Sequence, residues 1–82
     1  MDRIYIVSYS LEDDNKRLRD IYSVHKTAAG AAKSFEEITS ECDKMDGYVQ
    51  LSKTNKIAEY RINSHPTNQR LTIYINPINL QS

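Results

Sequence analysis

The two histidines and the single cysteine are the most chemically reactive residues of this sequence. A cysteine and a histidine can act as nucleophile and general base when their side chains come within hydrogen-bond distance. Here His25 precedes an expected helix cap, His65 precedes a proline, and Cys42 falls on the apolar stripe of the expected helix. The spacing assigns Cys42 to the core and indicates no catalytic residue, so we expect a protein that is not an enzyme.

Acidic residues and glycines, which build many metal and phosphate sites, form no such pattern here. Asp13 and Asp14 lack the glycine and the terminal glutamate of a calcium-binding loop. Gly30 and Gly47 fall inside the expected helix and at its end, so the sequence contains no glycine-rich phosphate loop. We therefore expect neither a metal ion nor a cofactor.

Tyrosine and arginine are the residue types that point to binding. Both are enriched at the hot spots of protein interfaces, and both can also stack on the bases of RNA. Several of them fall in segments with the alternation of β-strands. We expect the partner-binding surface to include Tyr5, Tyr9, Tyr48, Arg61, Arg70 and Tyr74.

The outside of the expected helix is a second candidate surface, because it is acidic. Glu37 and Glu41 lie there among further acidic residues, diluted by two lysines. An acidic helix can occupy a groove that normally binds nucleic acid, and so act as a decoy. A helix face that is merely solvated has the same composition.

Length and charge limit the classes of protein that remain. The chain has 82 residues, enough for one domain, 1–82, and its 11 basic and 11 acidic residues balance. This balance disfavours a nonspecific phosphate binder, which normally shows a clustered basic excess. One cysteine cannot form an internal disulfide, and a core of this size is only marginally stable, so we expect a homodimer. With no long apolar run and no secretory signal, we expect a cytoplasmic protein and no membrane contact.

Two strands and a helix are predicted in the first half of the chain. Residues 3–9 are apolar or aromatic on both faces, as in a strand in the middle of a sheet, and a second strand follows over 18–25. Thr27 is an N-cap, and Gly47 suits the left-handed residue after a helix. Between them, apolar residues recur every three or four positions, at Ala28, Ala31, Phe35, Ile38, Cys42 and Met45.

The last third of the chain predicts two hairpins that share a strand. A two-residue turn at Thr54-Asn55 would place Leu51 opposite Ala58, and a turn over 64–69 would place Ile62 opposite Leu71. Pro77 would end the ladder because it lacks a backbone donor. This register turns toward the helix Val49, Leu51, Ala58, Tyr60, Ile62, Leu71, Ile73 and Ile75. It turns away from the helix Tyr48, Gln50, Ile57, Glu59, Arg61, Arg70, Thr72 and Tyr74.

The element order β-β-α-β-β-β predicts an α+β fold, a two-layer sandwich of one antiparallel sheet with a single helix packed on one face. One helix has one narrow apolar stripe, so the other face of the sheet must meet solvent or a partner. From the first strand, either Tyr5, Val7 and Tyr9 or Ile4 and Ile6 must lie on that face.

The opening strand, the second strand running into Thr27-Ala-Ala-Gly-Ala-Ala-Lys, and the closing meander resemble the layout of many small bacteriophage accessory proteins. These include inhibitors of host enzymes and anti-defence proteins such as anti-CRISPRs. The resemblance includes no diagnostic motif and transfers no functional residue. It implies a non-catalytic protein of the bacterial cytoplasm that inhibits a host defence or nucleic-acid-processing protein. The alternative is an RNA- or nucleotide-binding protein that uses the tyrosines and arginines of the sheet face.

Overall fold

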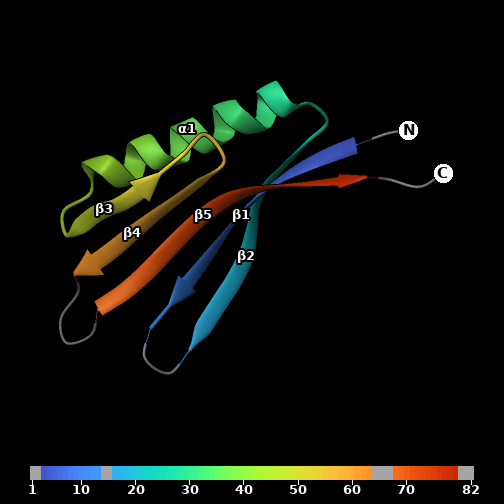
Figure 1. Ribbon diagram of the computed structural model, residues 1–82. Coiled ribbons are helices and arrows are strands. Elements are labelled where there is room, and N and C mark those ends of the chain that lie inside the picture. Colours follow the sequence, from blue (N-terminus) through green and yellow to red (C-terminus); the bar gives the residue numbers. More distant parts are fainter. Residues whose placement is uncertain (1–2, 14–15, 64–67, 80–82) are drawn as a thin grey trace.

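A single antiparallel sheet of five strands, in the order β2-β1-β5-β4-β3, is covered on one face by one helix (Figure 1). The computed structural model describes residues 3–13, 16–63 and 68–79. In chain order the elements are β1 (Arg3–Glu12), β2 (Arg17–His25), α1 (Ala28–Lys44), β3 (Tyr48–Lys53), β4 (Ile57–Asn63) and β5 (Asn68–Asn79). The predicted two-layer α+β sandwich, with its β-β-α-β-β-β order, is confirmed.

Helix α1 begins where the sequence predicts. Thr27 has an extended backbone, and its Oγ1 accepts a hydrogen bond of 3.0 Å from the backbone N–H of Gly30, as an N-cap does. The apolar stripe buries Ala31, Phe35 and Cys42 against the sheet, so the prediction that Cys42 belongs to the core is also confirmed.

The two ends of the predicted stripe lie outside the core. Met45 is 51% exposed because the helix stops at Lys44 and the backbone of Met45 is already extended. Ala28, in the first turn, is also exposed. Gly47 then takes a positive φ of 85°, the left-handed conformation predicted for the residue that turns the chain toward β3.

The central strands β1 and β5 pair over ten residues and bring Val7 and Ile73 into the core. The β4–β5 ladder ends before Pro77, with Ile57 opposite Tyr74, but β5 itself continues to Asn79 along β1, with Pro77 opposite Tyr5. The backbone N–H of Ile75 donates to Lys56 O on the β4 side, and the nitrogen of Pro77 points the same way. Since β4 begins at Ile57, this nitrogen faces a free edge and loses no hydrogen bond.

The register of β3 differs from the prediction by enough to exchange its two faces. The predicted turn at Thr54-Asn55 is displaced: Thr54 N–H donates to Ile57 O at 2.7 Å, so Asn55 and Lys56 lie at the tip. A bulge at Leu51 then inserts one unpaired residue into β3. Tyr48 therefore lies opposite Ile62 and Gln50 opposite Tyr60, so both face the helix, whereas Val49 and Leu51 do not contribute to the core.

The β4–β5 pairing is shifted by two residues from the prediction. Tyr60 lies opposite Leu71 and Ala58 opposite Ile73. Because side chains alternate with a period of two, this shift leaves every residue on its predicted face. Most of the predicted turn, together with His65, lies outside the described residues.

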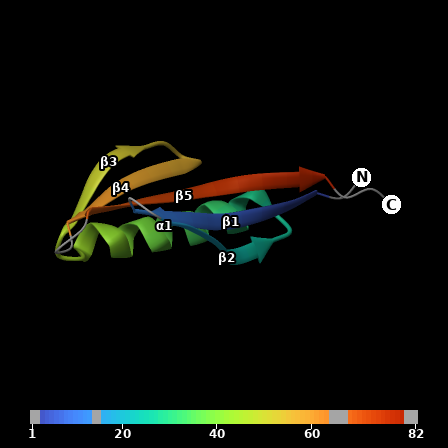
Figure 2. The ribbon, with the colours of Figure 1, turned by 90° about the horizontal axis from the view of Figure 1, so that it is seen from below.

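The second view of the ribbon shows α1 along one side of the sheet and no element on the other side (Figure 2). We call the uncovered side the open face.

Candidate functional site

The open face is built from rows of side chains that cross the strands, because directly paired residues point to the same side of a sheet. Its described residues are Arg17, Arg19, Ile21 and Val24 of β2; Ile4, Ile6, Ser8, Ser10 and Glu12 of β1; Arg70, Thr72, Tyr74, Asn76 and Ile78 of β5; Ile57, Glu59, Arg61 and Asn63 of β4; and Val49 and Ser52 of β3.

The rows nearest the chain termini form an apolar half. Ile4 lies opposite Ile78, Ile6 lies between Val24 and Asn76, and Ser8 lies between Ile21 and Tyr74, with Ile57 beyond. Several of these side chains are strongly exposed for their size: Ile21 and Val24 at 55%, Ile57 at 39% and Ile78 at 37%. Apolar patches of this kind on soluble proteins are often interaction sites.

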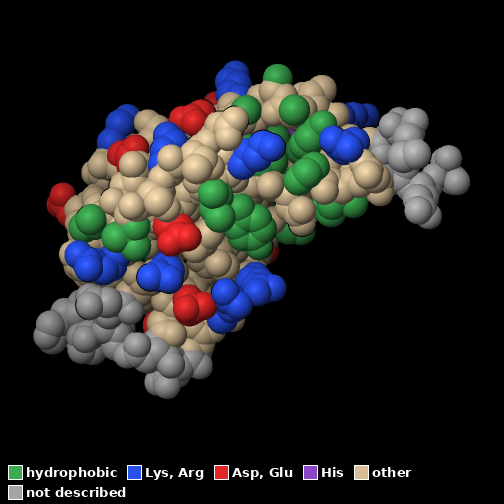
Figure 3. Space-filling model, viewed as in Figure 1, with side chains coloured by type: hydrophobic (Ala, Val, Ile, Leu, Met, Phe, Trp, Pro, Cys, Tyr) green, Lys and Arg blue, Asp and Glu red, His purple; other side chains and the backbone are tan. Residues whose placement is uncertain are grey.

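The rows nearest the hairpin turns form a charged half around a shallow depression of about 410 Å³. Its floor is low because β1 contributes the small side chain of Ser10, only 8% exposed, in the middle of the sheet. Around this floor stand Glu12, Arg17, Arg19, Ile57, Glu59, Arg70, Thr72 and Tyr74. In the view of Figure 3, basic side chains near the hairpin turns are interspersed with fewer acidic ones.

Arginine supplies every positive charge of the open face. Arg17 is paired with Glu12, Nε to Oε2 at 3.1 Å, whereas Arg19, Arg61 and Arg70 bond to no carboxylate among the described residues. Arg61 and Arg70 lie directly opposite each other on adjacent strands. Like charges in this arrangement repel, although Arg70 also lies opposite Glu12 of β1, whose carboxylate is bonded to Arg17.

The predicted site residues are divided between the two faces. Arg61, Arg70 and Tyr74 lie on the open face as predicted, although Arg61 faces Val49 and not Tyr48 across β3. The placement of Tyr5, Tyr9 and Tyr48 there is wrong, because all three pack against the core under α1. Of the two alternatives for the first strand, the structure therefore has Ile4 and Ile6 on the open face.

The acidic outer side of α1 is partly used inside the molecule. Glu37 and Glu41 are exposed there, as predicted, and form no ion pair within the described part of the chain. Glu36, by contrast, accepts a hydrogen bond of 3.0 Å from Lys53 Nζ of β3.

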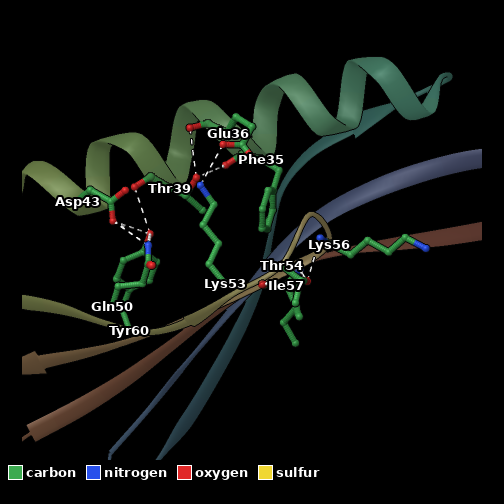
Figure 4. Close-up of polar contacts among 10 residues, drawn as sticks. All are labelled: Phe35, Glu36, Thr39, Asp43, Gln50, Lys53, Thr54, Lys56, Ile57 and Tyr60. Atoms are coloured by element: carbon green, nitrogen blue, oxygen red, sulfur yellow. Dashed lines mark hydrogen bonds and ion pairs between the residues drawn. The ribbon is translucent and has the colours of Figure 1, made fainter.

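A polar network joins the C-terminal half of α1 to β3 and β4 (Figure 4). The buried Tyr60 hydroxyl lies 2.9 Å from Asp43 Oδ1 and 3.2 Å from Thr39 O, and it accepts a hydrogen bond from Gln50 Nε2 at 3.3 Å. Burial, and to a lesser extent the carboxylate of Asp43, raise the pKa of Tyr60 to about 12. The network therefore holds a neutral phenol and serves to fix α1 on the sheet.

A chain of hydroxyl groups and one histidine joins the other half of α1 to β2. His25 Nε2 lies 2.8 Å from Ser23 Oγ, which lies 2.8 Å from Ser34 Oγ. No described carboxylate hydrogen-bonds to the ring, and its Nδ1 side faces Gly30, where an added Cβ would come within 3.3 Å. Sequence reasoning missed this contact, although the spacing of Ser23 and His25 by two residues on a strand places them on one face.

Cys42 has the chemistry of a buried residue. Burial is the main cause that raises the pKa of its thiol, and the neighbouring carboxylates of Asp43 and Glu41 add to the effect. A thiol in this state is a poor nucleophile, because the thiolate is the reactive form.

Residues 3–13, 16–63 and 68–79 contain neither a group of metal ligands nor a membrane-spanning helix. No three histidine, cysteine, aspartate or glutamate side chains there are grouped to hold a metal ion. In the same part of the chain, no helix is long and apolar enough to cross a membrane. Comparison of the chain with protein-family models, curated proteins and solved structures finds no match.

Proposed function

We propose that this chain is a small non-catalytic interaction protein that binds a partner protein through its open face. In this proposal, the apolar half of the face packs against an apolar surface of the partner. The arginines of the charged half bind carboxylates of the partner. Arg61 and Arg70 are the central pair, because a planar guanidinium can hold a carboxylate through two parallel hydrogen bonds.

The juxtaposition of Arg61 and Arg70 carries the proposal. The two residues are directly opposite, both are exposed, and neither bonds to a described carboxylate. A pair that destabilises the isolated sheet is expected where an external anion compensates for the repulsion. The adjoining apolar half favours a protein as the source of that anion, since protein interfaces combine apolar cores with polar rims.

The layout shared with small phage inhibitors suggests the kind of partner. We propose a host protein of the bacterial cytoplasm that takes part in defence or processes nucleic acid.

Binding of RNA or a nucleotide is the second candidate function. The arginine pair beside Tyr74 and Thr72 favours it, because guanidinium groups and aromatic rings hold phosphates and bases. Two observations weaken it: Tyr5, Tyr9 and Tyr48 are turned to the core, and Glu12 and Glu59 line the same depression.

Charge reversal at Arg61 tests the proposal. Partners are first captured from a bacterial lysate, with and without nuclease, and identified by mass spectrometry. Binding of the purified partner is then measured for the parent chain and for Arg61→Glu over a range of salt concentrations. We expect a loss of about 2 kcal/mol or more with a protein partner and a weak dependence on salt. A steep salt dependence that becomes shallower in the variant indicates RNA.

Lys33→Glu is the matched control. It makes the same charge change at an exposed position on α1, away from the open face. Equal binding by the parent and Arg61→Glu contradicts the proposal. If Lys33→Glu alone alters binding, the working surface is the acidic helix around Glu37 and Glu41.

A further inference from the structure

The outer edge of β2 is the most exposed apolar part of the molecule. Within the described residues, β2 pairs only with β1, so its other edge has no neighbouring strand over nine residues. Four of the nine large apolar side chains exposed in this part of the chain lie on β2: Leu18 at 58%, Ile21 and Val24 at 55%, and Tyr22 at 48%. A long apolar edge strand is a template for pairing with another chain.

The opposite edge of the sheet is arranged differently. Strand β3 has six residues, and its Lys53 and Gln50 are bonded to Glu36 and Asp43 of α1. Short length, a charged residue and contact with a helix are features that protect an edge strand. Strand β2 shares some of these features, since Arg19 and Asp20 are charged and Ser23 contacts Ser34 of α1, and a bulge leaves Tyr22 as an extra residue between Ile21 and Ser23. It differs from β3 in its length of nine residues and in its exposed apolar side chains.

This extra residue decides how β2 can pair with an identical strand. A twofold axis perpendicular to the sheet keeps each face on its own side, so paired residues must share a face. From their partners in β1, Arg19 and Val24 lie on the open face, whereas Leu18 and His25 lie on the helix side. In a regular strand, residues on the same face are an even number of positions apart. The bulge makes the separation odd, both from Arg19 to Val24 and from Leu18 to His25.

One antiparallel register satisfies this condition from Leu18 to His25. It pairs Leu18 with His25, Arg19 with Val24, Asp20 with Ser23, and Ile21 with Tyr22 of the second copy. In each pair whose faces are known from the pairing with β1, the two residues lie on the same face of the sheet. No pair places two like charges opposite each other. The apolar pair of Ile21 and Tyr22 is repeated on the two sides of the axis.

We infer that the protein forms a twofold dimer by antiparallel pairing of β2 with β2 of a second copy, centred on Ile21 and Tyr22. The two sheets join into one, with both helices on one side and both open faces on the other. This contact does not cover the open face, which stays available to a partner. Ile21 and Val24 of β2 also belong to the apolar half of the open face, but Arg61, which tests the proposed function, lies on β4, three strands from β2 in the sheet.

Sedimentation equilibrium of the full chain at tens of micromolar tests the inference. We expect about twice the 9.5 kDa mass of one chain. Ile21→Lys should weaken the dimer at least tenfold, because it brings two positive charges together near the axis. Circular dichroism melting checks that the variant is folded, which we expect because Ile21 is 55% exposed.

Two matched variants place a lysine elsewhere. Val49→Lys changes the other edge strand and Ile57→Lys changes the open face, both at positions that are 39% exposed, and neither should alter the dimer. A parent chain that remains monomeric overturns the inference. So does a dimer that survives Ile21→Lys, or one that dissociates with Ile57→Lys instead.

Discussion

The two faces of this sheet are made of the same five strands, but the side chains of one face are buried and those of the other are largely exposed. Under α1, Phe35, Val7, Tyr60 and Ile73 are buried, and the Tyr60 hydroxyl is hydrogen-bonded to the helix. On the open face, isoleucines remain exposed and Arg61 faces Arg70. The side chains of the covered face are thus packed and hydrogen-bonded within one chain, whereas the open face leaves apolar side chains exposed and two arginines opposite each other.

The largest effect should come from the covered face. Phe35→Ala removes the largest helix side chain in the core and should lower the free energy of unfolding by about 3–5 kcal/mol. This is comparable to the whole stability of so small a domain, so most of the protein should be unfolded. Urea denaturation measures the change. Ile57→Ala, an apolar truncation on the open face, should cost much less, and equal losses would remove the distinction between the two faces.

An alkaline titration should reveal the buried phenol of the covered face. The pKa of Tyr60 is raised to about 12 in the folded protein, above its usual value of about 10. A raised pKa favours the neutral form, so its stabilisation is complete below pH 10 and is lost as the pH rises toward 12. The shift corresponds to at most about 2–3 kcal/mol of the free energy of unfolding.

Denaturant unfolding at pH 8, 10 and 12 measures this loss, with Tyr60→Phe as the comparison. The variant lacks the ionising hydroxyl and should be less stable at pH 8 by about 1 kcal/mol. Its stability should also fall less steeply above pH 10. Parallel pH profiles for the two proteins would mean that Tyr60 does not remain protonated in the fold.

The smallest expected effect has the opposite sign and belongs to the open face. Arg61→Glu replaces a repulsive cross-strand pair with an attractive one next to Arg70, so the free energy of unfolding should rise by about 0.2–1 kcal/mol. The same variant should bind its partner less tightly. Thermal melting at low and high salt measures the gain, which salt should reduce. A lower melting temperature would show that Arg61 already has a stabilising role within the chain.

The sequence was sufficient for the element order, the helix and the faces of β4 and β5. Helix α1 is marked by local signals, the Thr27 cap and the spacing of Ala31, Phe35 and Cys42. The β4–β5 register was wrong by two residues, but an even shift leaves the faces unchanged.

The sequence did not predict which side chains of β3 and β1 point toward the helix. In β3, the displaced turn after Lys53 and the bulge at Leu51 together turn Tyr48 inward, and neither is marked by the alternation of the sequence. In β1, residues 4–7 are all apolar or aromatic, so alternation leaves both faces open. The contact of Ser23 with Ser34, and the pairing of Arg61 with Arg70, appear only once the strands are aligned.

Pro77 limits how far this sheet can grow. Past the start of β4, the edge of β5 is free, and a backbone without an N–H at that point cannot continue a regular ladder with an added strand. At the far side of the sheet, β3 has six residues against nine in β2, so β2 is the longer edge open to addition in the described part of the chain. A twofold contact there uses the same edge of both copies, so assembly stops at two chains and does not propagate into a fibre.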